Sequence, residues 1–161
     1  MQQEKQDQKR TFLCVIDGSP EVKQAIHYTA RRAKKVGANI MLLGLVAPAS
    51  GGSELMWGNV KNLVDNENHS HIKESVDNFV DYVKNITGFS PMTEITEGIA
   101  TDIIKRTLKD HPEIRILVLG ISEQENPGPL IKELTTGKTR LHIPITLVPG
   151  DILNEDIEML S

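Results

Sequence analysis

Apolar positions along this chain of 161 residues fall into two kinds of segment. Five short apolar runs are typical of β-strands, and between them lie longer segments in which apolar residues recur at helical spacing. The strand runs are Phe12–Ile16, Asn39–Val46, Met92–Thr96, Ile114–Leu119 and Pro144–Val148. The second and fourth runs are almost continuously apolar, which indicates strands covered on both faces.

Four helical segments are predicted between the strands. The first keeps an apolar face from Val22 to Val36, with Ser19 as its expected N-cap and Gly37 as its stop. The second and third are expected to end at Gly88 and before Pro112. The fourth has apolar residues at helical spacing, namely Leu130, Ile131, Leu134 and Leu141. Its helical propensity is lowered by Thr135, Thr136 and Gly137.

Strands that alternate with helices predict right-handed β–α–β crossovers, and therefore a mainly parallel α/β sheet with helices on both faces. One domain is expected over residues 11–150. Residues 1–10 are predicted to form a disordered lead-in, and residues 151–161 an acidic tail with a short helix beginning near Asn154.

The composition bears on whether the protein binds nucleic acid or membranes and on the compartment in which it is found. The formal net charge is −4, the basic residues are scattered and only 4% of residues are aromatic, so we expect no nucleic-acid partner. The only cysteine, Cys14, lies in an apolar run, which indicates a reducing compartment. No run approaches the roughly 20 apolar residues of a membrane span. These features predict a cytoplasmic protein without a membrane partner.

Asp17 is the best single polar candidate for a binding site. It directly follows the first strand and precedes a glycine and a helix start, so its carboxylate is expected at the sheet edge where open α/β sheets bind ligands. There it could accept hydrogen bonds from a ribose or an adenine. A purely local role in the Asp-Gly turn is equally open.

Other motifs in the sequence argue against a P-loop, a pyrophosphate loop, a metal site and a catalytic site. Gly137-Lys138-Thr139 is not a P-loop, because the glycine that the motif needs upstream is absent and no strand immediately precedes it. Ser50–Ser53 resembles the pyrophosphate loop of ATP pyrophosphatases, but it follows the second strand rather than the first. No His, Cys or acidic spacing predicts a metal site, and no nucleophile has a base and an orienting group, so we expect no catalytic residue.

Three parts of the sequence together resemble the universal stress protein family: the turn after the first strand, EGIATDIIK, and ILVLG…GPLIKELTTGK…IPITLVPG. The resemblance covers residues 12 to about 150. It implies an adenine-nucleotide α-hydrolase-like fold with strand order 3-2-1-4-5. It also implies a homodimer formed through the last strand, here Ile143–Val148.

The resemblance also implies a nucleotide site. Asp17 matches the acidic residue that contacts the nucleoside, and Leu45 lies where the second strand offers its backbone to adenine. Nucleotide-binding members carry Gly-x-x-Gly, nine residues and Gly-Ser/Thr after the fourth strand. The partial matches here are Gly120, Gly128, Gly137, Lys138 and Thr139. Gly128 is one place out of register and Lys138 replaces the hydroxyl residue, so the phosphate half of the site is altered while the adenine half is retained.

The function that follows is a stress-response protein that acts by binding and regulation, with weak binding of ATP, ADP or AMP. No enzymatic activity beyond weak ATP hydrolysis is expected. Two alternatives remain: a nucleotide-free dimeric interaction module and, less well supported, an enzyme of the ATP pyrophosphatase type.

Overall fold

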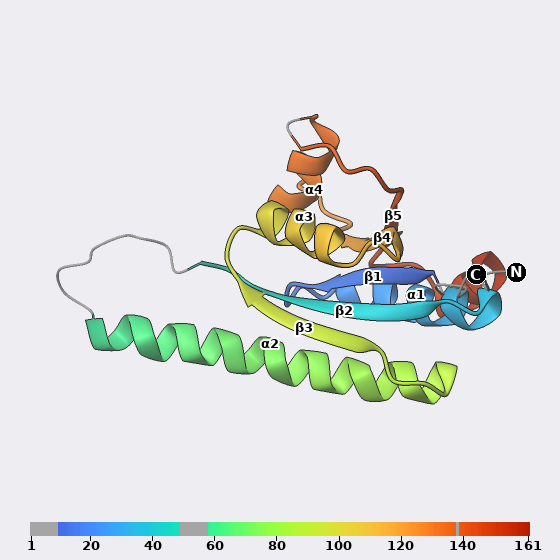
Figure 1. Cartoon of the computed structure of the whole chain (residues 1–161), viewed down its shortest axis with the longest axis horizontal. Helices are drawn as coiled ribbons and strands as arrows, with labels where there is room; N and C mark the ends of the chain where they lie inside the picture. Colours follow the sequence, from blue (N-terminus) through green and yellow to red (C-terminus); the bar gives the residue numbers. More distant parts are fainter. Residues whose placement is uncertain (1–9, 49–57, 138) are drawn as a thin grey trace, which may run out of the picture.

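A computed structural model describes residues 10–48, 58–137 and 139–161 of the chain. Its centre is a five-stranded sheet in which every neighbouring pair of strands is parallel, in the order β3-β2-β1-β4-β5 (Figure 1). The strands are β1 (Thr11–Ile16), β2 (Asn39–Val46), β3 (Met92–Glu97), β4 (Ile114–Ile121) and β5 (Ile145–Pro149). The predicted fold class and strand order are confirmed.

Five helices cover the sheet. They are α1 (Val22–Val36), α2 (Gly58–Thr87), α3 (Ala100–Asp110), α4 (Pro129–Thr135) and α5 (Asn154–Leu160). Helices α1 and α2 pack on one face and α3 and α4 on the other, and α5 lies against α1 (Figure 1). The N-terminal turns of α2 extend past the carboxyl ends of the strands (Figure 1).

Each face of the sheet has its own apolar core, because alternate residues of a strand point to opposite faces. On β1, Phe12, Cys14 and Ile16 pack with α1 and α2, while Leu13 and Val15 pack with α3 and α4. All six residues of β1 are buried. The position of β1 in the middle of the sheet explains why its sequence is apolar on both faces.

The helix ends follow local chemistry with one exception. Gly37 takes a left-handed φ of 70° and its N–H donates to the carbonyl of Ala33, as expected of a helix stop. The prediction that Ser19 caps α1 is wrong. The N-cap position is Glu21, two residues later, without a side-chain capping bond, and the hydroxyl of Ser19 donates to Asp17.

Two further expectations need adjustment. Helix α4 ends at Thr135, so Leu141 contributes to the core from beyond the helix rather than from within it. The last strand begins at Ile145 and not at Pro144. The predicted short C-terminal helix is present as α5. The predicted disordered lead-in over residues 1–9, the Ser50–Ser53 segment and Lys138 lie outside the described residues.

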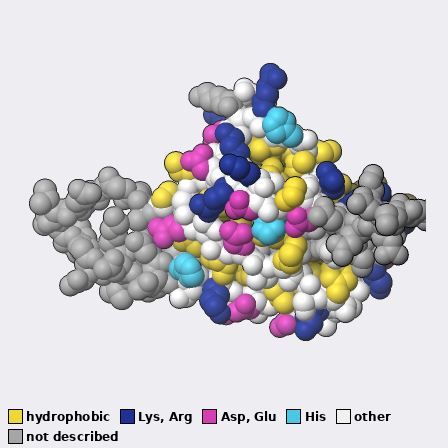
Figure 2. All heavy atoms as spheres, in the orientation of Figure 1, with side chains coloured by type: hydrophobic (Ala, Val, Ile, Leu, Met, Phe, Trp, Pro, Cys, Tyr) yellow, Lys and Arg dark blue, Asp and Glu magenta, His cyan; other side chains and the backbone are white. Residues whose placement is uncertain are grey.

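The molecular surface carries charges of both signs. On the face shown in Figure 2, Lys and Arg side chains are interspersed with Asp and Glu, without a broad field of one sign. This mixture does not provide the basic stripe typical of a nucleic-acid interface. Among the described residues, no helix is long and apolar enough to cross a membrane.

Candidate functional site

The sheet has a topological switch point between β1 and β4. From β1 the chain continues through α1 to β2 on one side, whereas β4 and β5 lie on the other side. The β1–β4 ladder ends at the pair Cys14–Val118, although β1 continues to Ile16 and β4 to Ile121. Open α/β sheets bind ligands at such a point, outside the carboxyl ends of the strands.

Asp17 lies at this edge, immediately after β1, and is exposed. Its Oδ1 accepts hydrogen bonds from the backbone N–H of Ser19 at 3.0 Å and from the hydroxyl of Ser19 at 2.6 Å. The carboxylate therefore holds the turn before α1, as Asp often does. Within the described part of the chain, only Oδ1 is used in this way, which leaves Oδ2 for a ligand.

The sheet register brings Leu45 next to Asp17. The last β1–β2 pair is Ile16–Gly44, so the next residues along the two strands are Asp17 and Leu45. Leu45 is 7% exposed, its side chain belongs to the core under α3 and α4, and it pairs on its other side with Thr96 of β3. A ligand at this position would meet the backbone of Leu45 rather than its side chain.

A cavity of about 260 Å³ opens on the α1 side of the same edge. Its lining residues follow three different strands: Pro20 and Glu21 after β1, Ser122, Glu123 and Gln124 after β4, and Gly150 after β5. This volume is slightly below the roughly 300–1,000 Å³ of typical small-molecule sites. It would accommodate part of a nucleotide, with the remainder lying toward Asp17 and Leu45.

Gly120 brings the start of α1 into contact with β4. A Cβ at this position would lie 2.6 Å from the carbonyl oxygen of Glu21 and 2.8 Å from its Cβ. Gly150 makes a similar approach, because its Cβ would lie 2.8 Å from Cγ of Glu21. These two glycines fix Glu21 on the cavity wall. The sequence did not identify Glu21 as a site residue, because its proximity to β4 and β5 depends on the strand order.

The other predicted glycines do not line the cavity. Gly128 precedes α4 with φ 93°, and its N–H donates to Oδ1 of Asn126 at 3.1 Å. Gly137 follows α4 with φ 86°. Both positive φ values suit glycine, so these residues shape the two ends of α4. Neither has a contact that assigns it to a phosphate.

Thr139 is withdrawn into the protein. It is 5% exposed, and its hydroxyl donates to Oε1 of Glu133 at 3.2 Å. The same oxygen accepts the hydroxyl of Thr101 at 3.4 Å. Glu133 thus ties the segment after α4 to the first turn of α3. No sequence motif predicts this arrangement, since Thr101 lies 32 residues before Glu133 and reaches it only through packing.

Two buried titratable groups lie away from this edge. Burial raises the pKa of the Cys14 thiol to about 12, which makes it unreactive. His27, on α1, is 5% exposed and contacts the hydroxyl of Tyr82 on α2 through Nδ1. Burial, followed by the positive charge of Arg31, lowers the pKa of His27. Across the described ranges, no group of three His, Cys, Asp or Glu residues is placed to hold a metal ion.

No protein-family profile matches this sequence. No curated protein sequence matches it at a significant level either.

Solved structures, in contrast, match over most of the chain. The universal stress protein UspA from Lactobacillus plantarum superposes with a TM-score of 0.73 at 21% identity, covering 86% of this chain and 97% of the other. A universal stress protein in complex with cAMP gives a TM-score of 0.62 at 14% identity and covers 89% and 98%. An Arabidopsis thaliana universal stress family protein with AMP bound gives 0.57 at 14%, covering 87% and 91%.

These similarities concern the backbone, because the sequence identities are low. They agree with the five-stranded parallel α/β architecture described above. This chain therefore has the fold of the universal stress proteins.

Proposed function

We propose that this protein binds an adenine nucleoside or nucleotide at the carboxyl edge of β1 and acts in the stress response by binding and regulation. The observation that carries the proposal is the juxtaposition of Asp17 and Leu45 at the end of the β1–β2 ladder, beside the switch point. One carboxylate and one stretch of strand backbone there provide the two kinds of polar contact that a nucleoside needs, an acceptor for ribose hydroxyls and backbone groups for the base.

Proteins of the same fold support this proposal. Two of the neighbours described above were crystallised with adenine nucleotides, one with cAMP and one with AMP. These two structures match 89% and 87% of this chain. The cavity beside them is of a size to accept part of such a ligand.

The direct test is release of ligand by heating purified protein, followed by mass spectrometry, together with calorimetric titration of adenosine, AMP, cAMP and ATP. We expect saturable binding of at least one of these compounds. Absence of any saturable binding up to millimolar concentration would contradict the proposal and favour the nucleotide-free interaction module.

Asp17 allows a sharper test because its two oxygens have different roles. Asp17→Asn retains an oxygen that can accept from Ser19, so the turn should persist while the charge is lost. Loss of a charged hydrogen bond costs roughly 1.5–3 kcal/mol, which corresponds to more than tenfold weaker nucleoside binding. Unchanged affinity in Asp17→Asn would remove Asp17 from the binding site. Ser19→Ala is the control for the turn alone, and it should leave affinity within about threefold if the turn itself contributes little.

The proposed mode of action is binding without turnover. The described residues at the cavity include carboxylates but no partnered nucleophile and base. We therefore expect at most weak ATP hydrolysis when the release of labelled phosphate is compared with a heat-treated control. Hydrolysis that disappears in Asp17→Asn would establish an enzyme instead.

We further propose a homodimer formed through β5. Among the described residues, this strand pairs only with β4, so its outer edge has no strand partner there. Beside it lies an apolar groove of about 160 Å³ lined in part by Leu134, Ile145 and Leu147, the last 37% exposed. An uncovered apolar edge favours association, and a second copy would cover it symmetrically. Leu147→Lys should shift the sedimentation coefficient toward that of a monomer, whereas a monomeric wild type at micromolar concentration would contradict the dimer.

For the compartment, we propose the reducing cytoplasm. The support is Cys14, which is the only cysteine of the chain and is buried as a free thiol. Fractionation of cells that produce the protein with a C-terminal epitope tag would test this location.

A further inference from the structure

We infer that this site selects against polyphosphates, so that the preferred ligand is an adenine nucleoside and the affinity falls with each added phosphate. The inference rests on the proposed function and specifies its ligand class. Two independent structural features carry it: the carboxylates on the cavity wall and the withdrawal of Thr139.

The first feature is the charge of the cavity. Two of its six described lining residues are acidic, Glu21 at the start of α1 and Glu123 in the loop after β4, and none is basic. Glu123 is exposed, whereas Glu21 is half-buried and held in place by the close approach of Gly120 and Gly150. A phosphate in this cavity would therefore lie near two negative charges, one of them on a fixed backbone.

The N-terminus of α1 opposes this effect only in part. A helix of 15 residues has a positive partial charge at its start, which favours anions. Here Glu21 occupies the N-cap position and Asp17 lies four residues before it, so the positive end already has acidic neighbours. The net preference at the cavity is for an uncharged, hydroxyl-rich group such as ribose.

The second feature is the position of Thr139. The resemblance places the hydroxyl residue that contacts the phosphates at position 138, where this chain has Lys138, and Thr139 offers the next hydroxyl along the chain. That hydroxyl is buried and donates to Glu133. A phosphate could gain this donor only if the bond to Glu133 broke, which would leave a half-buried carboxylate with one partner fewer. The hydroxyl of Thr139 is thus not free to donate to a phosphate, and the cavity wall separately carries two negative charges.

The experiment compares adenosine, AMP and ATP by calorimetric titration of the full chain at low ionic strength with EDTA. These ligands carry increasing negative charge. We expect adenosine to bind at least about tenfold more tightly than ATP, with AMP between them. In Glu123→Gln and Glu21→Gln, the ratio of ATP to adenosine dissociation constants should fall about three- to tenfold, since each removes one repulsive charge. In the wild type, added salt should lower the ratio of the ATP to the adenosine dissociation constant, because it screens the repulsion.

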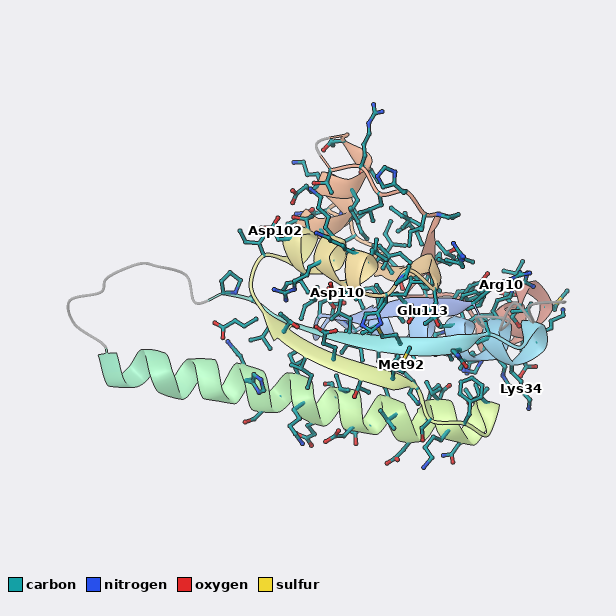
Figure 3. The ribbon with its side chains drawn as sticks, in the orientation of Figure 1. Arg10, Lys34, Met92, Asp102, Asp110 and Glu113 are labelled. Carbon is teal, nitrogen blue, oxygen red and sulfur yellow. The ribbon has the colours of Figure 1, made fainter. Side chains whose placement is uncertain are left out.

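Asp110→Asn is the matched control for the loss of one acidic charge. Asp110 is exposed in the last turn of α3 (Figure 3), whereas the cavity follows the carboxyl ends of the strands. The ratio should be unchanged in this variant. Circular dichroism spectra of all variants establish that the fold is retained.

The outcomes separate this inference from the proposed function. If ATP binds as tightly as adenosine, or if both glutamate variants leave the ratio unchanged, selection against polyphosphates is wrong although nucleotide binding stands. If none of the three compounds binds to the wild type or to any variant up to millimolar concentration, the proposed function itself fails. A preference for ATP that appears only with millimolar Mg²⁺ would also overturn the inference, because the chelated form would then be the ligand.

Discussion

Gly120→Ala is the substitution that most directly tests how the site is built. The structure leaves no room for a methyl group between β4 and the start of α1. The added Cβ would lie 2.6 Å from the carbonyl oxygen of Glu21, 2.7 Å from its carbonyl carbon and 2.8 Å from its Cβ. The first two of these are backbone atoms of the turn that enters α1, so the strain cannot be relieved by a side-chain rotation.

The magnitude follows from this geometry. Overpacking of a well-packed interior costs about 1–3 kcal/mol, and contact with backbone places this case in the upper part of that range. Replacing a glycine also restricts the unfolded chain, which returns about 0.4–1 kcal/mol. The net loss in the free energy of unfolding is therefore about 2 kcal/mol. For a domain of this size, that loss lowers Tm by roughly 4–8 °C.

Gly150→Ala provides a matched control at the other side of the same residue. Its nearest contact would be Cγ of Glu21 at 2.8 Å, which belongs to a side chain that can move. We expect a loss below about 1 kcal/mol. Adding Glu21→Ala removes Cγ and should relieve Gly150→Ala, but it retains all three atoms that oppose Gly120→Ala. A double-mutant cycle should therefore show coupling at Gly150 and none at Gly120.

The assay is urea unfolding followed by circular dichroism, with thermal unfolding as a second measurement. An unchanged m-value would show that the denatured and native states remain comparable. The reasoning is refuted if Gly120→Ala unfolds within 1 °C of the wild type, or if Glu21→Ala rescues it. Either result would mean that β4 and α1 are not in the close contact described.

Three further predictions concern the core. The pKa of His27 is lowered in the folded protein, so on acidification the unfolded chain takes up a proton before the folded chain does. The free energy of unfolding should therefore fall as the pH drops below about 6.5, by at most about 1.4 kcal/mol per pH unit. In urea titrations at several pH values, His27→Gln should reduce this dependence on pH. Cys14 should resist a thiol reagent in native protein and react fully in urea; rapid native labelling would contradict its burial. Ile157→Ala should cost about 2–5 kcal/mol in unfolding titrations, because Ile157 is the buried residue of α5, whereas Glu158→Gln, which weakens a surface ion pair with Arg31, should change stability by less than about 1 kcal/mol.

The sequence carried most of the fold, for a physical reason visible in β1 and β2. Strands buried on both faces are almost continuously apolar, and the helices that cover them have one apolar face. Both patterns can therefore be recognised within a short stretch of sequence. Gly37 ends α1 through its own left-handed backbone. The cap of α1 differs from the local prediction because the helix begins at Val22, with Glu21 rather than Ser19 at its N-cap position.

The site was less predictable because it is assembled from distant segments. The position of Asp17 at the sheet edge could be predicted, because it follows an apolar strand. The position of Glu21 on the cavity wall could not be predicted, since it depends on glycines in β4 and after β5 that approach Glu21 only in the finished sheet. Glu133 joins two threonines from separate segments, a contact that no local pattern encodes. The sequence therefore predicts the edge of the sheet at which the candidate site lies, whereas the acidic groups and hydrogen-bond donors that meet there depend on the tertiary structure.

The central place of β1 has a consequence for how the chain is made. This strand leaves the ribosome before the other four described strands and pairs with β2 soon afterwards, but its other partner, β4, follows about 100 residues later. Until then one long apolar edge of β1 lies uncovered, and the parallel pairing that covers it requires closure of a long loop. A nascent chain that ends before Ile114 thus exposes the unpaired apolar edge of β1. For this protein, the interval in which β1 waits for β4 is the period of greatest exposure to aggregation and of greatest dependence on chaperones.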